Sequence, residues 1–499
     1  MRRIVLVALF ALLLSGWPVP PSAGAAGSDP KTRPLPPIPL SLGEVLAWID
    51  RSHPLLHGAG TEKITARGRL LKAFGAFEPT LVNDMEIERF IPSSEALKGI
   101  RDDRIGGFND TFLEVRHPSG IRAMGGIRTG INPILNPDLV FNNGREQILV
   151  GGTVPLLKGL MVNPDSAELQ RSGLADPRAD IEIAQTRQDL FLAAASQYWE
   201  WVAAWKLAEV QQRAVNVAED RFKQIEGRAK KGLSAPLDAV EANQEVQRRR
   251  EILIAAKRGV EQEQYKLSLF LWENGQPATP DSARVPDFPK TVSLPLPETV
   301  KADKLAARGT RPEVLAVGVE AKLNNIDLEL AKNNLLPSLD LTAEPPRTPQ
   351  SYVLGLGYRF GAEFRLPFLQ RRARGEVMEA QGKADRLVLT QQFREQQVLV
   401  DVDNALSAVE RAKQRIDAAS QSLQLARTLE EGERFRFSLG ATSVLFVNLR
   451  ERNAVDSENQ WIRALADYQQ AIAQYQWAIG TWAKAPASVI PVSYKPAAK

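Results

Sequence analysis

Residues 352–366 read YVLGLGYRFGAEFRL, and apolar and polar side chains alternate along the whole stretch. The even-numbered positions carry the apolar and aromatic side chains: Tyr352, Leu354, Leu356, Tyr358, Phe360, Ala362, Phe364 and Leu366. The odd-numbered positions carry mostly glycine and charge: Val353, Gly355, Gly357, Arg359, Gly361, Glu363 and Arg365. A period of two residues predicts a β-strand, because successive side chains of a strand point to opposite faces.

The apolar side of this strand is expected to face lipid. A soluble β-sandwich alternates in the same way, so alternation alone leaves both possibilities open. Two features favour the membrane. The stretch exceeds the ~10 residues that a strand needs to cross a bilayer, and its side of glycine and charge suits a water-filled lumen. We therefore assign Leu354, Leu356, Tyr358 and Phe360 to a lipid-facing strand.

The chain is interpreted as one structural unit used twice. The strand at 352–366 ends in Pro-Phe-Leu at 367–369, and a similar Pro-Leu-Leu stands at 155–157. Three more features recur at matching places: two prolines 25 residues apart (Pro54 and Pro79, Pro312 and Pro337), a small glycine turn (Gly232-Leu233-Ser234, Gly440-Ala441-Thr442) and a Gln-Tyr pair before a tryptophan (Gln264-Tyr265 and Trp272, Gln474-Tyr475 and Trp482). A long unit that cannot bury its faces alone implies assembly.

The expected strands are too few to close a barrel within one chain. About eight strands are the practical minimum for a closed membrane barrel. An open sheet edge in lipid would leave backbone N–H and C=O groups without hydrogen-bond partners. Several chains are therefore expected to contribute to one barrel.

Long helices are expected between the strands and the glycine turns. Nothing breaks a helix from about 179 to 231, a length of roughly 75 Å at 1.5 Å per residue. Columns of small and apolar residues with a spacing of seven form a coiled-coil seam: Val398, Ala405, Ala412, Ala419 and Ala426; Val402, Val409, Ile416 and Leu423; and, in the first half, Ala194, Trp201, Ala208, Val215 and Phe222. Such a seam fits either a wall of helices around a tube or a simple coiled-coil spacer.

These signals divide the chain into five parts. Residues 1–25 have the basic start, the apolar run and the Ala-Gly-Ala cleavage site of a secretory signal peptide. The remaining parts are a first repeat at 26–273 (a helix, strands within 79–156 and a helical hairpin at 179–272), a Pro-rich periplasmic linker at 274–310, a second repeat at 311–485 (a helix, strands within 337–368 and a helical hairpin at 375–483) and a flexible tail at 486–499.

The strand region of the first repeat contains an insertion. Pro79 and Pro155 are 76 residues apart, whereas Pro337 and Pro367 are 30 apart, so the first repeat carries 46 more residues there. The insertion adds either strands or an extracellular loop, and long additions of both kinds occur in barrels.

Composition and charge argue against nucleic-acid binding and catalysis. The net charge is only +4 over 499 residues, and the basic residues, including the run Arg248-Arg249-Arg250, are interpreted as solvated helix faces. No cysteine is present, which excludes disulfides and thiolate metal sites. His53 and His57 lie one helical turn apart, but no third ligand stands near them in the sequence, so they are interpreted as polar residues near a helix start. Neither a catalytic constellation nor a phosphate-binding glycine loop is present, so no enzyme activity and no cofactor are expected.

Acidic residues interrupt the seam of the second repeat before its turn. Glu430, Glu431 and Glu433 stand about ten residues before Gly440. One interpretation is a solvated end of the hairpin. The other is a carboxylate cluster at a constricted mouth, which makes these three residues the candidate periplasmic gate.

The duplicated order of helix, strands, helix, turn and helix resembles the TolC-like outer-membrane efflux family. Three further features carry this resemblance. They are the sequence Leu-Leu-Pro-Ser-Leu at 335–339, where the chain enters a strand, the sequences at 155–157 and 367–369, where it leaves the strands, and the two glycine turns. It implies a mostly α fold with a membrane β-barrel, in which each of three chains gives four strands to a shared twelve-strand barrel. Long coiled-coil helices would continue that barrel across the periplasm. The family has an aspartate ring at the tunnel mouth, and Glu431 stands at the matching position.

The resemblance also implies partners. A periplasmic adaptor would contact the hairpin tips, and an inner-membrane pump would complete the assembly. The residues at these tips are Gly232, Leu233, Ser234, Gly440, Ala441 and Thr442. The expected partners are thus two further copies of the chain, the adaptor, the pump and outer-membrane lipid, with no nucleic acid.

The expected function is a passive exit duct of a tripartite efflux or type I secretion system. It would lie in the outer membrane of a Gram-negative bacterium and extend into the periplasm. The alternative is a periplasmic coiled-coil adaptor or scaffold without a pore. Such a scaffold would have helical hairpins but no lipid-facing strands.

Overall fold

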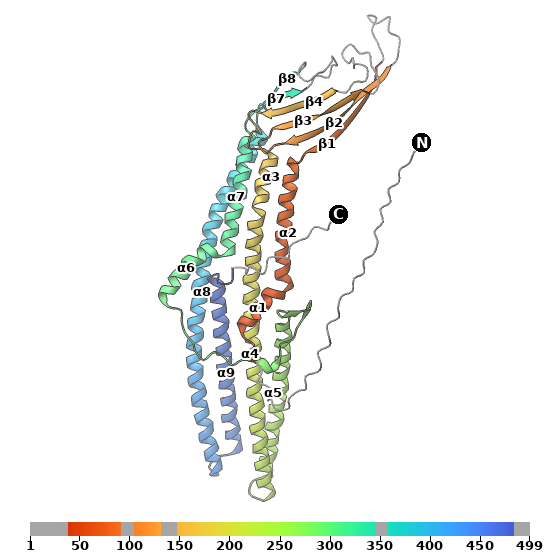
Figure 1. The fold of residues 1–499 in the computed structure, drawn as a ribbon. Helices are drawn as coiled ribbons and strands as arrows, with labels where there is room; N and C mark the ends of the chain where they lie inside the picture. The colour runs from red at the N-terminus through yellow and green to blue at the C-terminus, as the bar shows by residue number, and fades with distance from the viewer. Residues whose placement is uncertain (1–37, 91–103, 131–146, 345–357, 484–499) are drawn as a thin grey trace, which may run out of the picture. The chain divides into compact units, whose positions relative to one another are not determined.

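The computed structural model describes residues 38–90, 104–130, 147–344 and 358–483 (Figure 1). The chain divides into a leading segment, Met1–Ile38, and a compact unit, Pro39–Lys499, to which every described helix and strand belongs. The expected signal peptide and C-terminal tail lie outside the described residues. So do Leu354 and Leu356 of the expected lipid-facing strand.

Two helices, α1 (Leu42–Ser52) and α2 (Pro54–Phe74), precede the first strand, with the short 3₁₀ helix η1 (Gly75–Phe77) after them. Ser41 caps α1, because its hydroxyl accepts a hydrogen bond from the backbone N–H of Glu44 at 3.2 Å. The proline that opens α2 has no N–H to donate and is tolerated only in the first turn of a helix, so α1 ends before it.

Six strands form one antiparallel sheet: β1 (Thr80–Phe90), β2 (Arg104–Arg116), β3 (Arg122–Gly130), β4 (Gln147–Pro155), β7 (Ser338–Glu344) and β8 (Arg359–Arg365). Their order is β1-β2-β3-β4-β7-β8, and the pairing of β4 with β7 joins the two halves of the chain. The resemblance implied four strands for each chain, and this number is wrong for the described residues. The insertion in the first half adds strands, because part of it folds as the hairpin of β2 and β3.

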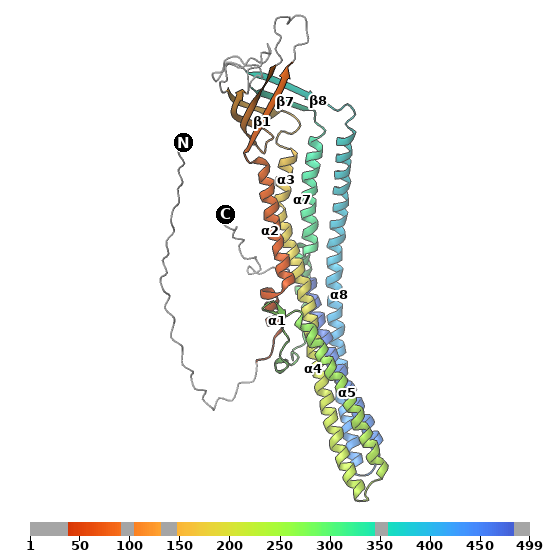
Figure 2. The ribbon, with the colours of Figure 1, turned by 90° about the vertical axis from the view of Figure 1, so that its right-hand side faces the viewer.

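The long helices form two antiparallel hairpins. The first consists of α4 (Ala175–Lys230), which follows the short α3 (Pro164–Gly173), and α5 (Pro236–Ser268); the second consists of α8 (Arg371–Ser438) and α9 (Val444–Ala478). Helix α4 packs against both α5 and α9, so the hairpins lie side by side (Figure 2). At the turns Gly232 has φ +74° and Gly440 has φ +75°, a backbone conformation that glycine adopts without steric cost.

The segment between the hairpins contains short elements and the helix that leads back to the sheet. These elements are β5 (Trp272–Glu273), β6 (Gln276–Pro277), η3 (Ser282–Arg284), α6 (Pro297–Thr310) and α7 (Pro312–Asn333). The region 274–310, expected as a linker, thus contains β6, η3 and α6. Helix α7 packs along α8 (Figure 1).

The predicted seam of the second hairpin is buried. Seven of its nine members on α8 are at most 7% exposed: Val398, Val402, Ala405, Val409, Ala412, Ile416 and Leu423. All of these seven except Leu423 belong to one apolar cluster with Tyr468 and Tyr475 of α9. The other two members, Ala419 and Ala426, are half-buried. A second cluster surrounds Trp201 of α4. In the parts of the chain that the structure describes, no helix combines the length and apolar character needed to span a bilayer.

Candidate functional site

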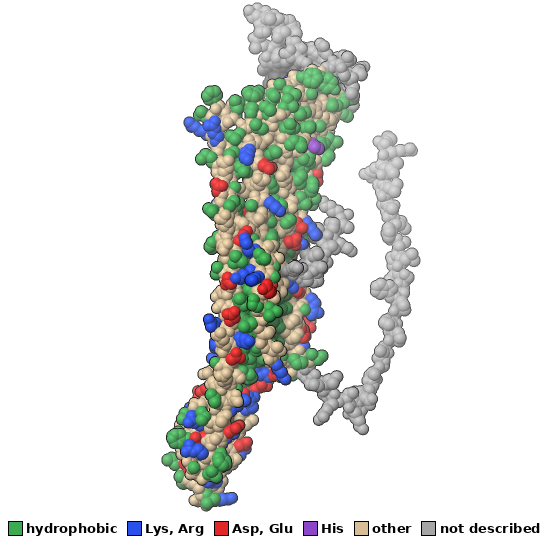
Figure 3. Space-filling view, turned by 90° about the vertical axis from the view of Figure 1, so that its left-hand side faces the viewer, with side chains coloured by type: hydrophobic (Ala, Val, Ile, Leu, Met, Phe, Trp, Pro, Cys, Tyr) green, Lys and Arg blue, Asp and Glu red, His purple; other side chains and the backbone are tan. Residues whose placement is uncertain are grey.

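The sheet has one apolar face. Residues paired in register on neighbouring strands point to the same side, and the register therefore shows which side chains share a face. The apolar face carries large side chains from all six strands: Leu81, Met85 and Ile87; Leu113 and Val115; Ile127; Ile148, Val150 and Val154; Leu341; Phe360 and Phe364. Each of them is between 36% and 79% exposed. On β1 and β2 this face also carries the polar Asn83, Asn109 and Thr111, which are joined by hydrogen bonds from Asn83. Figure 3 shows hydrophobic side chains gathered over the region of the strands.

The opposite face carries charge. Its ionisable members with described side chains are Asp84, Glu86, Asp110, Glu114, Arg116, Arg122, Arg128, Asp340, Glu344, Arg359, Glu363 and Arg365. Asp110 of β2 and Arg128 of β3 form a bidentate pair with two contacts of 2.6 Å, from Nε to Oδ1 and from Nη2 to Oδ2. Their side chains are 10% and 9% exposed. On the inserted strands this face therefore carries a buried ion pair, beside the apolar Phe112 and Met124.

Two of the four residues assigned to lipid contact are described. Tyr358 is 46% exposed and Phe360 is 79% exposed, and their rings stack with centroids 6.1 Å apart. Phe360 pairs with Ala343 of β7, and Phe364 pairs with Leu339. The even-numbered residues of β8 thus lie on the apolar face of the sheet.

The hairpin tips end in the same backbone motif. The N–H of Leu233 donates to the carbonyl of Arg228 at 2.9 Å, and the N–H of Ala441 donates to the carbonyl of Arg436 at 2.9 Å. These bonds satisfy helix-end carbonyls as in a Schellman motif. Gly232, Leu233, Gly440 and Ala441 are exposed, whereas Ser234 and Thr442 are half-buried.

The three candidate gate residues lie in different environments. The carboxylate of Glu430 pairs with Nη2 of Arg434 at 2.7 Å. Glu433 is 8% exposed and lies 3.5 Å from Nη1 of Arg436. Glu431 is exposed and makes no ion pair with any residue that the structure describes. Two of the acids therefore have an arginine partner on their own helix, and Glu431 is exposed without a partner among the described residues.

An ion cluster joins the four hairpin helices near these residues. We call it the hairpin ion cluster, and it comprises Arg221 of α4, Glu245 and Arg249 of α5, Glu430 and Arg434 of α8, and Glu451 and Arg452 of α9. Its two central carboxylates, those of Glu245 and Glu451, are each 3% exposed. Because no two neighbouring helices could supply this set, it forms only when the hairpins lie side by side.

Glu451 is the centre of this cluster. Its Oε1 pairs with Arg221 and accepts from Nη2 of Arg434 at 2.8 Å. Its Oε2 lies 3.6 Å from Nη2 of Arg249. Arg221 also donates to the side chain of Asn448 at 2.8 Å. One carboxylate thus connects α9 to α4, α5 and α8.

Glu245 carries the second connection between the hairpins. Its Oε1 accepts from Nε of Arg249 at 2.9 Å, within α5, and from Nε of Arg452 at 3.2 Å, across to α9. Its Oε2 accepts from Nη2 of Arg452 at 2.5 Å. One buried carboxylate thus binds arginines of both hairpins.

Burial and charge shift the pKa values within the cluster. Burial, together with repulsion from Arg434 and Arg249, lowers the pKa of Arg221 to about 10. Burial disfavours the charged form of Glu245, but the hydrogen bond from Arg452 and the nearby arginine charges outweigh it, so the pKa of Glu245 lies below its usual value. Arg221 and Glu245 therefore both remain charged near pH 7.

The sequence-based interpretation of the basic runs as solvated faces is wrong at Arg249, which is 4% exposed. A signal for this was present. On α5 the buried positions Ala242, Val246 and Leu253 are four and seven residues apart. Arg249, three residues after Val246 and four before Leu253, completes the same stripe. A charged residue at a core position of a helix requires a partner, and Glu245 stands four residues before it.

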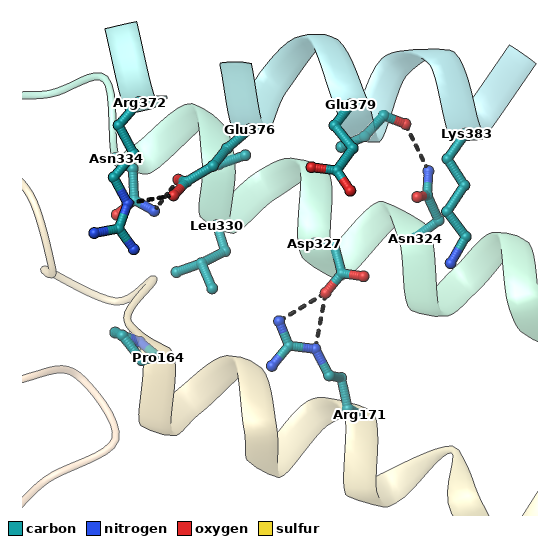
Figure 4. A pocket seen from close by; sticks show the side chains of 12 residues that line it. Pro164, Arg171, Asn324, Asp327, Leu330, Asn334, Arg372, Glu376, Glu379 and Lys383 are labelled. Carbon is teal, nitrogen blue, oxygen red and sulfur yellow. Dashed lines mark hydrogen bonds and ion pairs between the residues drawn. The ribbon is translucent and has the colours of Figure 1, made fainter. Parts of the chain in front are cut away.

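A polar cleft of about 460 Å³ lies between α3, α7 and α8 (Figure 4). Nη2 of Arg171 reaches Asp327 at 2.6 Å, and Glu376 accepts from Arg372 and Asn334, each at 3.0 Å. The hydrogen bonds to Arg372 and Asn334 lower the pKa of Glu376. These pairs tie the three helices to one another, so we interpret the cleft as part of the helix packing.

The two neighbouring histidines have structural roles. His53 caps α2, since its Nδ1 accepts from the N–H of Leu55 at 3.3 Å, and its Nε2 lies 3.2 Å from the carbonyl of Leu269. Burial lowers the pKa of His53. Nε2 of His57 lies 2.8 Å from the carbonyl of Arg51. Across the described ranges, no three His, Cys, Asp or Glu residues are grouped to hold a metal ion.

No protein-family model and no curated protein matches the chain. Solved structures do. The CmeC outer membrane channel of Campylobacter jejuni is 14% identical, with a TM-score of 0.62 over 88% of this chain and 85% of that one. The outer membrane protein VceC of Vibrio cholerae is 15% identical, with a TM-score of 0.63 over 88% and 96%. The MtrE outer membrane channel of Neisseria gonorrhoeae, in its open state, is 17% identical, with a TM-score of 0.62 over 89% and 90%. The chain therefore has the fold of these outer-membrane proteins, and the prediction of a mostly helical, TolC-like fold is confirmed.

Proposed function

We propose that the protein is a passive exit channel of the outer membrane of a Gram-negative bacterium, within a tripartite efflux or type I secretion system. The observation that carries this proposal is the sheet with an exposed apolar face and a charged opposite face. Large contiguous apolar surfaces are rare on soluble monomers and mark contact with lipid or protein. An apolar outer side and a polar inner side are what a membrane barrel requires.

The two sheet edges support a barrel shared among copies. Among the described strands, β1 and β8 stand at the edges, each with one neighbour. In lipid, the backbone N–H and C=O groups on the outer side of each edge strand would need hydrogen-bond partners. The β8 edge of a second copy would supply such partners to β1. Three copies are proposed from the family resemblance. The charged face would then line a water-filled lumen.

The long helices support a duct through the periplasm. Helix α4 has 56 residues and α8 has 68, which at 1.5 Å per residue correspond to roughly 84 Å and 100 Å. A periplasmic scaffold without a pore would use such hairpins too. A scaffold would not need a sheet with an exposed apolar face. The presence of that face therefore favours the channel over the scaffold.

The proposal is tested on the full-length protein. Membranes are fractionated, the protein is extracted in mild detergent, and its native mass and conductance in planar bilayers are measured. We expect one dominant oligomer from the outer-membrane fraction that conducts ions. Recovery of a folded monomer from the soluble periplasmic fraction would favour the scaffold instead.

The hairpin tips are proposed to contact the periplasmic adaptor. Leu233 is 66% exposed and Leu439 is 68% exposed, so each tip presents an apolar side chain that a partner could cover. We expect the double variant Leu233→Asp with Leu439→Asp to lose export at least tenfold while the oligomer still assembles. Export is measured as efflux of a fluorescent dye from cells.

The matched control for the tips is Lys223→Glu, since Lys223 is 72% exposed but lies on the body of α4. This control should export normally. Full export by the double tip variant would count against docking at the tips.

Glu431 is proposed as the acid of a cation-selective mouth. Its charge is exposed, whereas Glu430 and Glu433 are paired with arginines. Symmetry would bring copies of Glu431 near one another, and a ring of like charges attracts cations. We expect Glu431→Gln to reduce cation selectivity several-fold in single-channel recordings, measured as the reversal potential in a salt gradient.

The control for the mouth is Glu251→Gln, which removes an exposed acid from α5. Its reversal potential should equal that of the parent. An unchanged reversal potential in Glu431→Gln would place the selectivity elsewhere.

A further inference from the structure

The hairpin of β2 and β3 lies within the sheet. It stands between β1 and β4 in the strand order. Every residue of β1, from Thr80 to Phe90, is paired with β2. On the other side, β3 is paired with β4 from Arg122 opposite Thr153 to Arg128 opposite Gln147. The hairpin therefore separates β1 from β4 along the length of both strands.

The turn of this hairpin is anchored where the sheet meets the helices. The N–H of Met161 donates to the carbonyl of Ser119 at 3.0 Å, and Nδ2 of Asn163 donates to the carbonyl of Pro118 at 2.8 Å. Asn163 also caps α3 with a reciprocal capping box. The turn is thus tied to the segment that connects β4 to α3.

Glycine at position 120 permits this close contact. Gly120 has φ +91°, and a Cβ built there would lie 2.3 Å from the carbonyl oxygen of Gly159. Such an approach is far below van der Waals contact, so only glycine fits without a shift of the backbone. The turn is packed against the junction and does not project from it.

The inserted strands follow the same two-faced pattern as their neighbours. Leu113 and Ile127 lie on the apolar face, 49% and 46% exposed. The pair of Asp110 and Arg128 is 10% and 9% exposed on the charged face. The hairpin therefore has a side for lipid and a side for the lumen.

We infer that each chain contributes six strands to the shared barrel, so that three copies close eighteen strands where the family resemblance implies twelve. This inference rests on the proposed function. Barrel diameter grows roughly in proportion to strand number, and with strands ~4.8 Å apart and tilted ~40° the backbone diameter is about 36 Å rather than about 24 Å. The lumen within the membrane is thereby about 1.5 times wider.

The sheet has more strands than it has helices next to it. Among the described elements, four helices of each chain precede or follow the strands along the sequence: α2, α3, α7 and α8. The turn at 117–121, between β2 and β3, leads to no helix and is held by its contacts with Met161 and Asn163.

Electron microscopy of the detergent-purified, full-length oligomer tests this inference, together with its native mass. A trimer with eighteen strands and a barrel about 1.5 times as wide as a twelve-strand barrel supports it. A trimer with a twelve-strand barrel overturns the inference but leaves the proposed function in place. A folded monomer overturns both.

Cysteine cross-linking in membranes provides a second measurement, because the chain contains no native cysteine. Nδ2 of Asn83 lies 2.7 Å from Oγ1 of Thr111, so the pair Asn83→Cys with Thr111→Cys should cross-link within one chain through a short bifunctional thiol reagent. The control pair, Asn83→Cys with Ile148→Cys, joins β1 to β4 and should not react. Reaction of the control pair alone would show that β1 lies beside β4, and it would overturn the inference.

Discussion

Replacing Glu451 by alanine is expected to destabilise the pairing of the two hairpins by about 3–5 kcal/mol, the range for removing one partner of a buried ion pair. The carboxylate is 3% exposed and interacts with Arg221, Arg249 and Arg434. Without it, the buried guanidinium group of Arg221 would lose its ion-pair partner, whereas Arg249 would keep Glu245 and the partly exposed Arg434 would keep Glu430. The isosteric variant Glu451→Gln should be destabilised as well, because it keeps the volume but removes the charge.

Hydrogen exchange measures this effect on the assembled protein. Amides of α5 and α9 near the cluster should exchange faster in Glu451→Ala, while amides of the sheet should not change. The matched control is Glu226→Ala, which removes an exposed pair with Lys230, 2.9 Å apart and 43% and 71% exposed. Exposed pairs contribute about 0–1 kcal/mol. Equal exchange in the two variants would mean that the hairpin ion cluster adds no more than a surface pair.

Replacing Met85 by arginine is expected to destabilise the barrel by about 2–4 kcal/mol if the residue lies near the bilayer midplane. Met85 stands in the middle of β1 and is 60% exposed on the apolar face. A guanidinium group at that position would lose its hydration in lipid, whereas the apolar side chain of methionine has no such desolvation cost. The comparison variant is Glu86→Arg, which places the same side chain on the charged face one residue later.

The assembly of both β1 variants is followed as the fraction of heat-resistant oligomer in outer membranes. Their stabilities are then compared by urea titration in vesicles. Met85→Arg should assemble poorly, and Glu86→Arg should resemble the parent. If both variants assemble equally well, the apolar face does not contact lipid, and the proposed orientation of the sheet is reversed or wrong.

Local chemistry explains what could be predicted from the sequence. The alternation in β8, the coiled-coil seam on α8 and the proline between α1 and α2 are each set by a few neighbouring residues. The turns at Gly232 and Gly440 are likewise local, because positive φ angles of +74° and +75° favour glycine whatever surrounds it. These features were sufficient to predict the helical hairpins, their turns and the strand β8.

The number of strands depended on longer-range pairing. The insertion between Pro79 and Pro155 could have formed a loop or strands, and its own residues did not distinguish the two. The pairing of β2 with β1 and of β3 with β4 decides it. Because backbone hydrogen bonds between strands join segments far apart in the chain, composition within the insertion carries little information about them.

The sequence by itself determined the helices, their seams, their turns and the apolar side of β8, since each depends on periodicity within one segment. The tertiary structure alone decided the six-strand sheet and the environment of the charged residues near the hairpin ends. Arg249 looked solvated within its run of three arginines, and Glu430 looked like part of an acidic mouth. Glu430 is paired with Arg434 of its own helix, and Arg249 is paired with Glu245 of its own helix and with Glu451 of α9. A charge removed from water is stable only beside an opposite charge, and for Arg249 one such partner comes from the other hairpin.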